Sequence, residues 1–108
     1  MVDQELDDLK REFLAEAEEK VREMQATLSS TNNPDSLHRL GYLAHQLKGS
    51  GGSYGYQRIS ADAAEIEKAV EAVSDGGIDQ GVEKKILEHV SRLQSEIGAR
   101  ARELGRAV

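Results

Sequence analysis

The sequence contains no cysteine, no tryptophan, one proline and one phenylalanine. Without cysteine, disulfide bonds and thiolate metal sites are excluded. No stretch approaches the roughly 18 apolar residues that a membrane-spanning helix needs. The acidic segment 1–10 also has no apolar core of the kind that marks a signal peptide. We therefore expect a cytoplasmic protein that does not insert into a membrane.

Positive charge is also scarce, because 14 lysines and arginines face 20 aspartates and glutamates, which gives a net charge of −6. This balance argues against nonspecific binding to nucleic acid or to an anionic membrane surface. The length of 108 residues suits one domain over residues 1–108. It is too short to hold a kinase with an ATP site beside a second module.

Apolar residues recur at helical spacing in four segments, which predicts four amphipathic helices. The first stripe is Val2, Leu6, Leu9, Phe13, Ala17, Val21, Met24 and Leu28. The second is Leu37, Leu40, Ala44 and Leu47, the third is Ile59, Ala63, Ile66, Val70 and Val73, and the fourth is Val82, Ile86, Val90, Leu93, Ile97, Ala101 and Leu104. No window alternates at period two, so no strand is expected. The fold class predicted is all-α, an antiparallel up-down-up-down four-helix bundle that stays monomeric.

The helix boundaries follow from turn and capping residues. The first helix should stop at the turn formers of segment 29–33, and the second should begin with Asn33 as cap and Pro34 in the first turn. It should end inside the glycine-rich run 49–55. The third helix is expected from about Gln57 to Val73, and the fourth should begin after a cap at Asp79.

Of the three histidines, His45 occupies an unusual position. At 100° per residue it lies nearly opposite the apolar stripe of its helix, so its ring should point away from the core. The outer face around it contains His38, Gly41, Tyr42, Lys48, Gly49 and Gly52. A glycine inside a helix costs about 1 kcal/mol relative to alanine. Glycines on both sides of an exposed imidazole therefore suggest room for a large partner.

The residue types around His45 favour one kind of chemistry. A neutral imidazole is a competent nucleophile near pH 7 and can form a covalent phosphohistidine. Lys48, three residues later on the same face, can stabilise the negative charge of a phosphoryl group. The missing side chain of Gly49 can let the active site of a partner close over the ring.

The segment Ala44-His45-Gln46-Leu47-Lys48-Gly49-Ser50, followed by Gly51 to Gly55, resembles the signature A-H-x-L-K-G-S-x-x-x-x-G of histidine-containing phosphotransfer (HPt) domains. The resemblance implies that His45 accepts a phosphoryl group from an aspartyl phosphate of a receiver domain and passes it to another receiver aspartate. Lys48 would support the phosphoryl oxygens and Gly49 would provide access.

The resemblance also implies the partners, which are a response-regulator receiver domain and a sensor or hybrid histidine kinase. The Mg²⁺ that transfer needs would be held by the receiver, so no metal or other cofactor is expected on this chain. The glycine run has no preceding strand and no following Lys-Ser/Thr, so it is not an ATP-binding loop. The chain would therefore be a carrier and not an enzyme in its own right. Partner contacts are assigned to His38, Gly41, Tyr42, Gln46, Gly52 and Tyr56.

Several alternatives stay open beside this interpretation. The same bundle could be a docking module that binds a receiver or a kinase without accepting phosphate, or a purely structural helical protein. Tyr42, Tyr54 and Tyr56 could cover the loop or form an apolar rim around the histidine. His38 is interpreted as an ordinary surface residue in preference to a tuning residue, and His89, beside the core stripe, as nonfunctional. A zinc site on His38 and His45 is disfavoured because no third ligand is evident.

Overall fold

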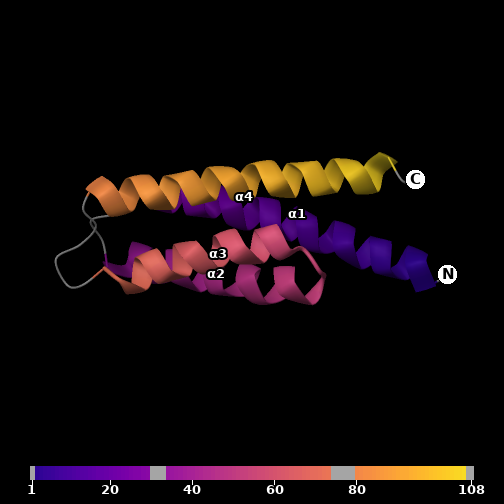
Figure 1. The fold of residues 1–108 in the computed structure, drawn as a ribbon, viewed down its shortest axis with the longest axis horizontal. Helices are drawn as coiled ribbons and strands as arrows, with labels where there is room; N and C mark the ends of the chain where they lie inside the picture. The colour runs from indigo at the N-terminus through magenta and orange to yellow at the C-terminus, as the bar shows by residue number, and fades with distance from the viewer. Residues whose placement is uncertain (1, 30–33, 74–79, 107–108) are drawn as a thin grey trace.

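The computed structural model describes residues 2–29, 34–73 and 80–106, and within these ranges the chain is helical without any strand (Figure 1). The helices are α1 (Val2–Leu28), α2 (Pro34–Ser53), α3 (Gln57–Glu71) and α4 (Gln80–Arg106). The predicted all-α fold class is confirmed. Pro34 opens α2 and the glycine run contains its end, as expected, whereas the predicted caps Asn33 and Asp79 lie outside the described residues.

The third helix ends two residues earlier than predicted. After Glu71, the N–H of Ala72 still donates to the carbonyl of Lys68 and that of Val73 to the carbonyl of Val70. These bonds form a last turn that is no longer regular helix, as is common at helix ends.

The four helices share one aliphatic core. α1 packs against α2 and α4, and α3 packs against the same two helices, so that contacts run around the set in a ring. The buried side chains are Phe13, Leu14, Ala17, Val21, Met24, Leu28, Leu40, Leu43, Ala44, Leu47, Ile59, Ala63, Ile66, Ala69, Ile86, Val90, Leu93 and Ile97. No polar or charged side chain is fully buried in the described part of the chain. The polar side chains of these residues are therefore at least partly exposed.

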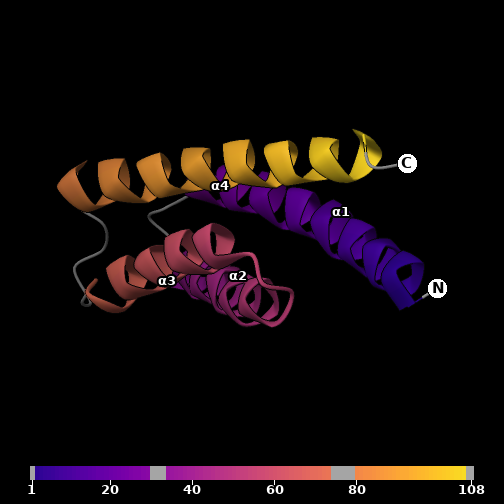
Figure 2. The ribbon, with the colours of Figure 1, turned by 45° about the vertical axis from the view of Figure 1, so that its right-hand side comes forward.

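The predicted stripe of α1 is wrong at its first turns. Leu6 and Leu9 are 42% and 47% exposed, whereas Leu14, which the stripe omits, is buried. The reason is length, because α1 and α4 have 27 residues each while α2 and α3 have only 20 and 15. Figures 1 and 2 show the start of α1 passing beyond the α2–α3 turn and diverging from the end of α4. The short hairpin cannot cover that end of α1.

A tight turn joins α2 to α3 and fixes their spacing. Gly55 has a φ of +82°, a conformation that glycine adopts without strain, and the N–H of Tyr56 donates to the carbonyl of Gly51 at 2.8 Å. A side-chain carbon on Gly51 would lie 3.2 Å from both the Ile59 side chain and the backbone nitrogen of Ser60. The absence of a side chain there lets the two helices approach closely, so that residues facing each other across the hairpin can meet.

Candidate functional site

His45 projects from α2 into solvent. Its side chain is 65% exposed, whereas Leu43, Ala44 and Leu47 on the opposite face are buried. The prediction that this ring points away from the core is therefore confirmed. The sequence pattern alone left open what the ring contacts.

A single carboxylate on α3 contacts both His45 and Lys48 of α2. One oxygen of Glu67 lies 2.7 Å from Nδ1 of His45, and the other lies 2.6 Å from Nζ of Lys48. Glu65 and Glu67 fit the acidic pattern that the resemblance implies for this helix, but the sequence indicates no role for Glu67 in the site. The one signal for it is that it follows the buried Ile66 on α3, but only the register between α2 and α3 brings it to the histidine.

Glu67 remains ionised because its neighbours stabilise the charged form. The hydrogen bond from Lys48 lowers the pKa of Glu67 most, the bond from His45 lowers it further, and partial burial opposes both. An ionised carboxylate can only accept hydrogen bonds, so Nδ1 of the histidine must carry the hydrogen and donate the hydrogen bond to Glu67. In the neutral ring this leaves the lone pair on Nε2 available, which is the arrangement a nucleophilic imidazole requires.

The side of His45 toward α1 is open. A side-chain carbon built on Gly49 meets nothing within 4 Å. A shallow depression here is lined by His45, Gln46, Gly49 and Ser50 of α2 and by Glu16 and Lys20 of α1. A large group can therefore approach the ring from this side, where Lys20 adds a positive charge and Glu16 a negative charge.

The other two glycines assigned to this face behave differently. A side-chain carbon on Gly41 would lie 3.2 Å from Cγ1 of Val70, so this half-buried glycine packs against α3. Its interpretation as open space beside His45 is wrong, because the hairpin partner fills that sector of the helical wheel. Gly52 is exposed, and a carbon on it would make only an ordinary 3.6 Å contact with Oγ of Ser60.

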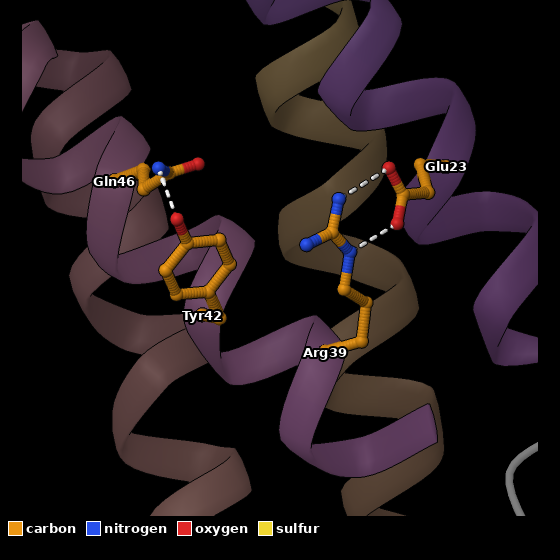
Figure 3. Close-up of polar contacts among 4 residues, drawn as sticks. All are labelled: Glu23, Arg39, Tyr42 and Gln46. Atoms are coloured by element: carbon orange, nitrogen blue, oxygen red, sulfur yellow. Dashed lines mark hydrogen bonds and ion pairs between the residues drawn. The ribbon is translucent and has the colours of Figure 1, made fainter. Parts of the chain in front are cut away.

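Tyr42 lies one turn before His45 and is held by its neighbours (Figure 3). Its ring is among the exposed large side chains, at 50% exposure. Nε2 of Gln46 donates to the tyrosine hydroxyl at 2.8 Å, and the guanidinium of Arg39 lies 5.4 Å from the ring centroid. Arg39 in turn makes two hydrogen bonds to Glu23 of α1, which lower the pKa of that carboxylate.

Tyr54 and Tyr56 do not share this exposure. Their rings stack on Phe13 of α1, with centroids 5.1 Å and 6.0 Å apart, and burial raises the pKa of Tyr56. The structure therefore favours the covering role for Tyr56 and the exposed-rim role for Tyr42, whereas Tyr54 both stacks on Phe13 and lines the depression beside His45. The partner contact assigned to Tyr56 stays a prediction, made from a ring that packs inward.

The two remaining histidines lie in different surroundings. His38 is exposed and makes no hydrogen bond or ion pair with the described residues. His89 of α4 is only 12% exposed, and its Nδ1 lies 2.9 Å from Oδ1 of Asp62 on α3. Across residues 2–29, 34–73 and 80–106, no three acidic or histidine side chains gather as metal ligands. None of the helices in these ranges is long and apolar enough to cross a membrane.

Comparison with known proteins bears on this geometry. Residues 8–102 match the family model described as "Hpt domain", a match that includes parts of all four helices and the whole of the α2–α3 hairpin. No curated protein and no solved structure matches the chain. The matched range contains His45, Lys48 and Glu67, the three side chains that the fold brings together. The chain therefore belongs to the Hpt domain family, whose members carry phosphoryl groups on histidine in two-component phosphorelays and have no ATP site of their own.

Proposed function

We propose that His45 accepts a phosphoryl group from the aspartyl phosphate of a receiver domain and delivers it to the aspartate of another receiver. The observation that carries this proposal is an exposed imidazole whose Nδ1 is bonded to Glu67. An imidazole held in this way keeps its nucleophilic lone pair on Nε2, away from the protein.

The transfer step needs no separate base, because the attacking nitrogen Nε2 carries no proton. The Nε2 lone pair forms a bond to phosphorus while the bond from phosphorus to the aspartyl oxygen breaks, and its electron pair returns to the aspartate carboxylate. The ring keeps its proton on Nδ1 and gains positive charge, which the adjacent carboxylate of Glu67 stabilises. The reverse sequence on a second receiver returns the neutral ring.

Lys48 pairs with Glu67 before transfer and also stabilises the phosphoryl group on His45 after it. In the unphosphorylated protein its ammonium is paired with Glu67 at 2.6 Å, and the lysine side chain is 40% exposed. A phosphoryl group on His45 places new anionic oxygens one helical turn away, within reach of a flexible lysine. The ammonium can then be shared between carboxylate and phosphoryl group. Gly49 leaves the space through which the receiver closes.

In this proposal, residues 1–108 form one domain whose four helices run in antiparallel up-down-up-down order. The protein is a monomer and acts in the cytoplasm. The ring of contacts among the four helices supports this order. Its partners are a receiver domain and a sensor or hybrid histidine kinase. The protein binds no cofactor itself, and the Mg²⁺ used in transfer belongs to the receiver.

The test is transfer of radioactive phosphate from each phosphorylated receiver domain of the source organism to the purified protein. Wild type should acquire an acid-labile, base-stable label, and His45→Gln should acquire none. His89→Gln is the control, since it removes an imidazole of α4 that is paired with Asp62 and not with Glu67, and it should be labelled like wild type. Equal labelling of His45→Gln would refute the proposal. A receiver that binds without labelling the wild type would indicate a docking module instead.

A further inference from the structure

The end of α2 carries the lysine of the site and is rich in glycine. Residues 48–53 begin with Lys48 and include Gly49, Gly51 and Gly52. Glycine is the weakest helix former apart from proline, because its backbone loses the most freedom when it is fixed. Two of these glycines have a reason in the fold, since position 49 is open and position 51 lets α3 approach closely. The lysine therefore lies on a stretch whose own sequence favours opening of the helix.

Backbone hydrogen bonds close the far end of this stretch. The N–H of Tyr56 donates to the carbonyl of Gly51 at 2.8 Å, and that of Gly55 donates to the carbonyl of Gly52 at 3.1 Å. Together with the φ of +82° at Gly55, these bonds form the arrangement that commonly terminates a helix at glycine. They satisfy carbonyls beyond Lys48 and do not involve Lys48 itself.

Ser60 of α3 supplies a hydrogen bond at Lys48. Its hydroxyl donates to the carbonyl oxygen of Lys48 at 2.8 Å, and the residue is half-buried. A carbonyl oxygen has two lone pairs, so it can accept this bond beside the helical bond from the N–H four residues later. The position of Ser60 is fixed in turn, because its own N–H donates to the carbonyl of Tyr56 at 3.1 Å.

Lys48 is thus held by α3 at both of its ends. Ser60 bonds the backbone carbonyl, and Glu67 contacts the ammonium at 2.6 Å. Seven residues separate Ser60 from Glu67, which is about two helical turns, so both lie on the same face of α3. The first bond fixes where the lysine side chain starts, and the second fixes where it ends. The ammonium of a flexible side chain that is 40% exposed depends on both for its position.

We propose that Ser60 is a positioning residue for phosphotransfer, because its hydroxyl keeps the glycine-rich end of α2 helical and thereby keeps the ammonium of Lys48 beside His45. This inference rests on the proposed function, in which Lys48 stabilises the phosphoryl group. Local opening of residues 48–53 would carry the lysine backbone away from α3, and the hydroxyl reduces the fraction of molecules in that open form. Ser60 acts through Lys48 and takes no part in the making or breaking of bonds to phosphorus.

A double-mutant cycle between Ser60 and Lys48 tests this role. The rate is that of single-turnover transfer from a phosphorylated receiver that labels wild-type His45. Ser60→Ala should slow transfer about two- to tenfold, the effect of losing one partly buried hydrogen bond. In the Lys48→Ala background the same substitution should change the rate by less than about twofold, because the group that it positions is absent. A wild-type rate for Ser60→Ala, or an equal slowing in both backgrounds, would overturn the positioning role while leaving the proposed function intact.

Amide hydrogen exchange provides a second measurement that needs no receiver. The amides of residues 51–53 should exchange about two- to tenfold faster in Ser60→Ala than in wild type, whereas those of α4 should keep their wild-type rates. Ser91→Ala is the matched control, since it removes an exposed serine hydroxyl of α4 and should change neither exchange nor transfer. Unchanged exchange at residues 51–53 in Ser60→Ala would overturn the inference by itself. If no receiver labels the wild type, the proposed function fails, and the role of Ser60 in transfer fails with it.

Discussion

The contact between Glu67 and His45 leads to a quantitative prediction for the variant Glu67→Ala. The substitution removes two charge-assisted contacts, at 2.7 Å to His45 and at 2.6 Å to Lys48. Such bonds contribute roughly 1.5–3 kcal/mol where they are sheltered. Here the histidine and lysine side chains are 65% and 40% exposed. After solvent screening, the extra stabilisation that the carboxylate gives to the positively charged ring during transfer, over what it gives to the neutral ring, is about 1 kcal/mol. At 1.4 kcal/mol per factor of ten, phosphotransfer should slow about fivefold.

The assay is the single-turnover rate of transfer from a phosphorylated receiver, together with the ring nitrogen spectrum of His45. Wild type should carry the neutral-ring proton on Nδ1, and Glu67→Ala should release it to Nε2 in part of the molecules. Glu67→Gln should fall between the two, because its amide oxygen still accepts from Nδ1 but cannot pair with the lysine. Glu65→Ala is the control, since it removes another carboxylate of α3, one paired with Lys68 and not with His45 or Lys48. A wild-type transfer rate in Glu67→Ala, with the proton on Nε2 in the native protein, would refute the reasoning.

Two further predictions concern stability. Gly49→Ala should raise the free energy of unfolding by up to about 1 kcal/mol, because it adds a helix-favouring residue in open space. Gly51→Ala should lower the free energy of unfolding by about 1–3 kcal/mol, because the added carbon would lie 3.2 Å from the α3 backbone. Urea denaturation measures both variants, and a change of the same sign in both would contradict these two predictions. The third prediction concerns acid. Folding lowers the pKa of Glu67 from its ordinary value of 4.5, so the stability it contributes is present above that pH and is lost as the pH falls through the lower folded value. The difference in unfolding free energy between wild type and Glu67→Gln should therefore shrink below about pH 4.5; a constant difference from pH 7 to pH 3 would count against it.

Helical periodicity predicted most of the fold because each amphipathic stripe consists of residues from one continuous segment. The stripe of α4 illustrates this, since Ile86, Val90, Leu93 and Ile97 are all buried as expected. The outward direction of His45 follows from the same local geometry. Errors arose where burial depends on another helix. Leu6 has the right spacing, but nothing in its own segment states that α2 and α3 are too short to cover it.

The sequence did not predict the role of Glu67 for a similar reason. Glu67 reaches His45 because of the register between two helices, and that register depends on the close approach at Gly51 and on the turn at Gly55. No spacing inside α2 or α3 encodes it. Gly41 was misjudged for the same reason, since the space beside it is filled by Val70 from the neighbouring helix.

The hairpin that unites His45, Lys48 and Glu67 is a local unit of the chain, because its two helices are joined by only three residues, 54–56. The guanidinium of Arg39, which lies over the Tyr42 ring, is instead held by Glu23, which belongs to α1. Substitutions on α1 can therefore change the surroundings of Tyr42 without removing any of the contacts that join His45, Lys48 and Glu67.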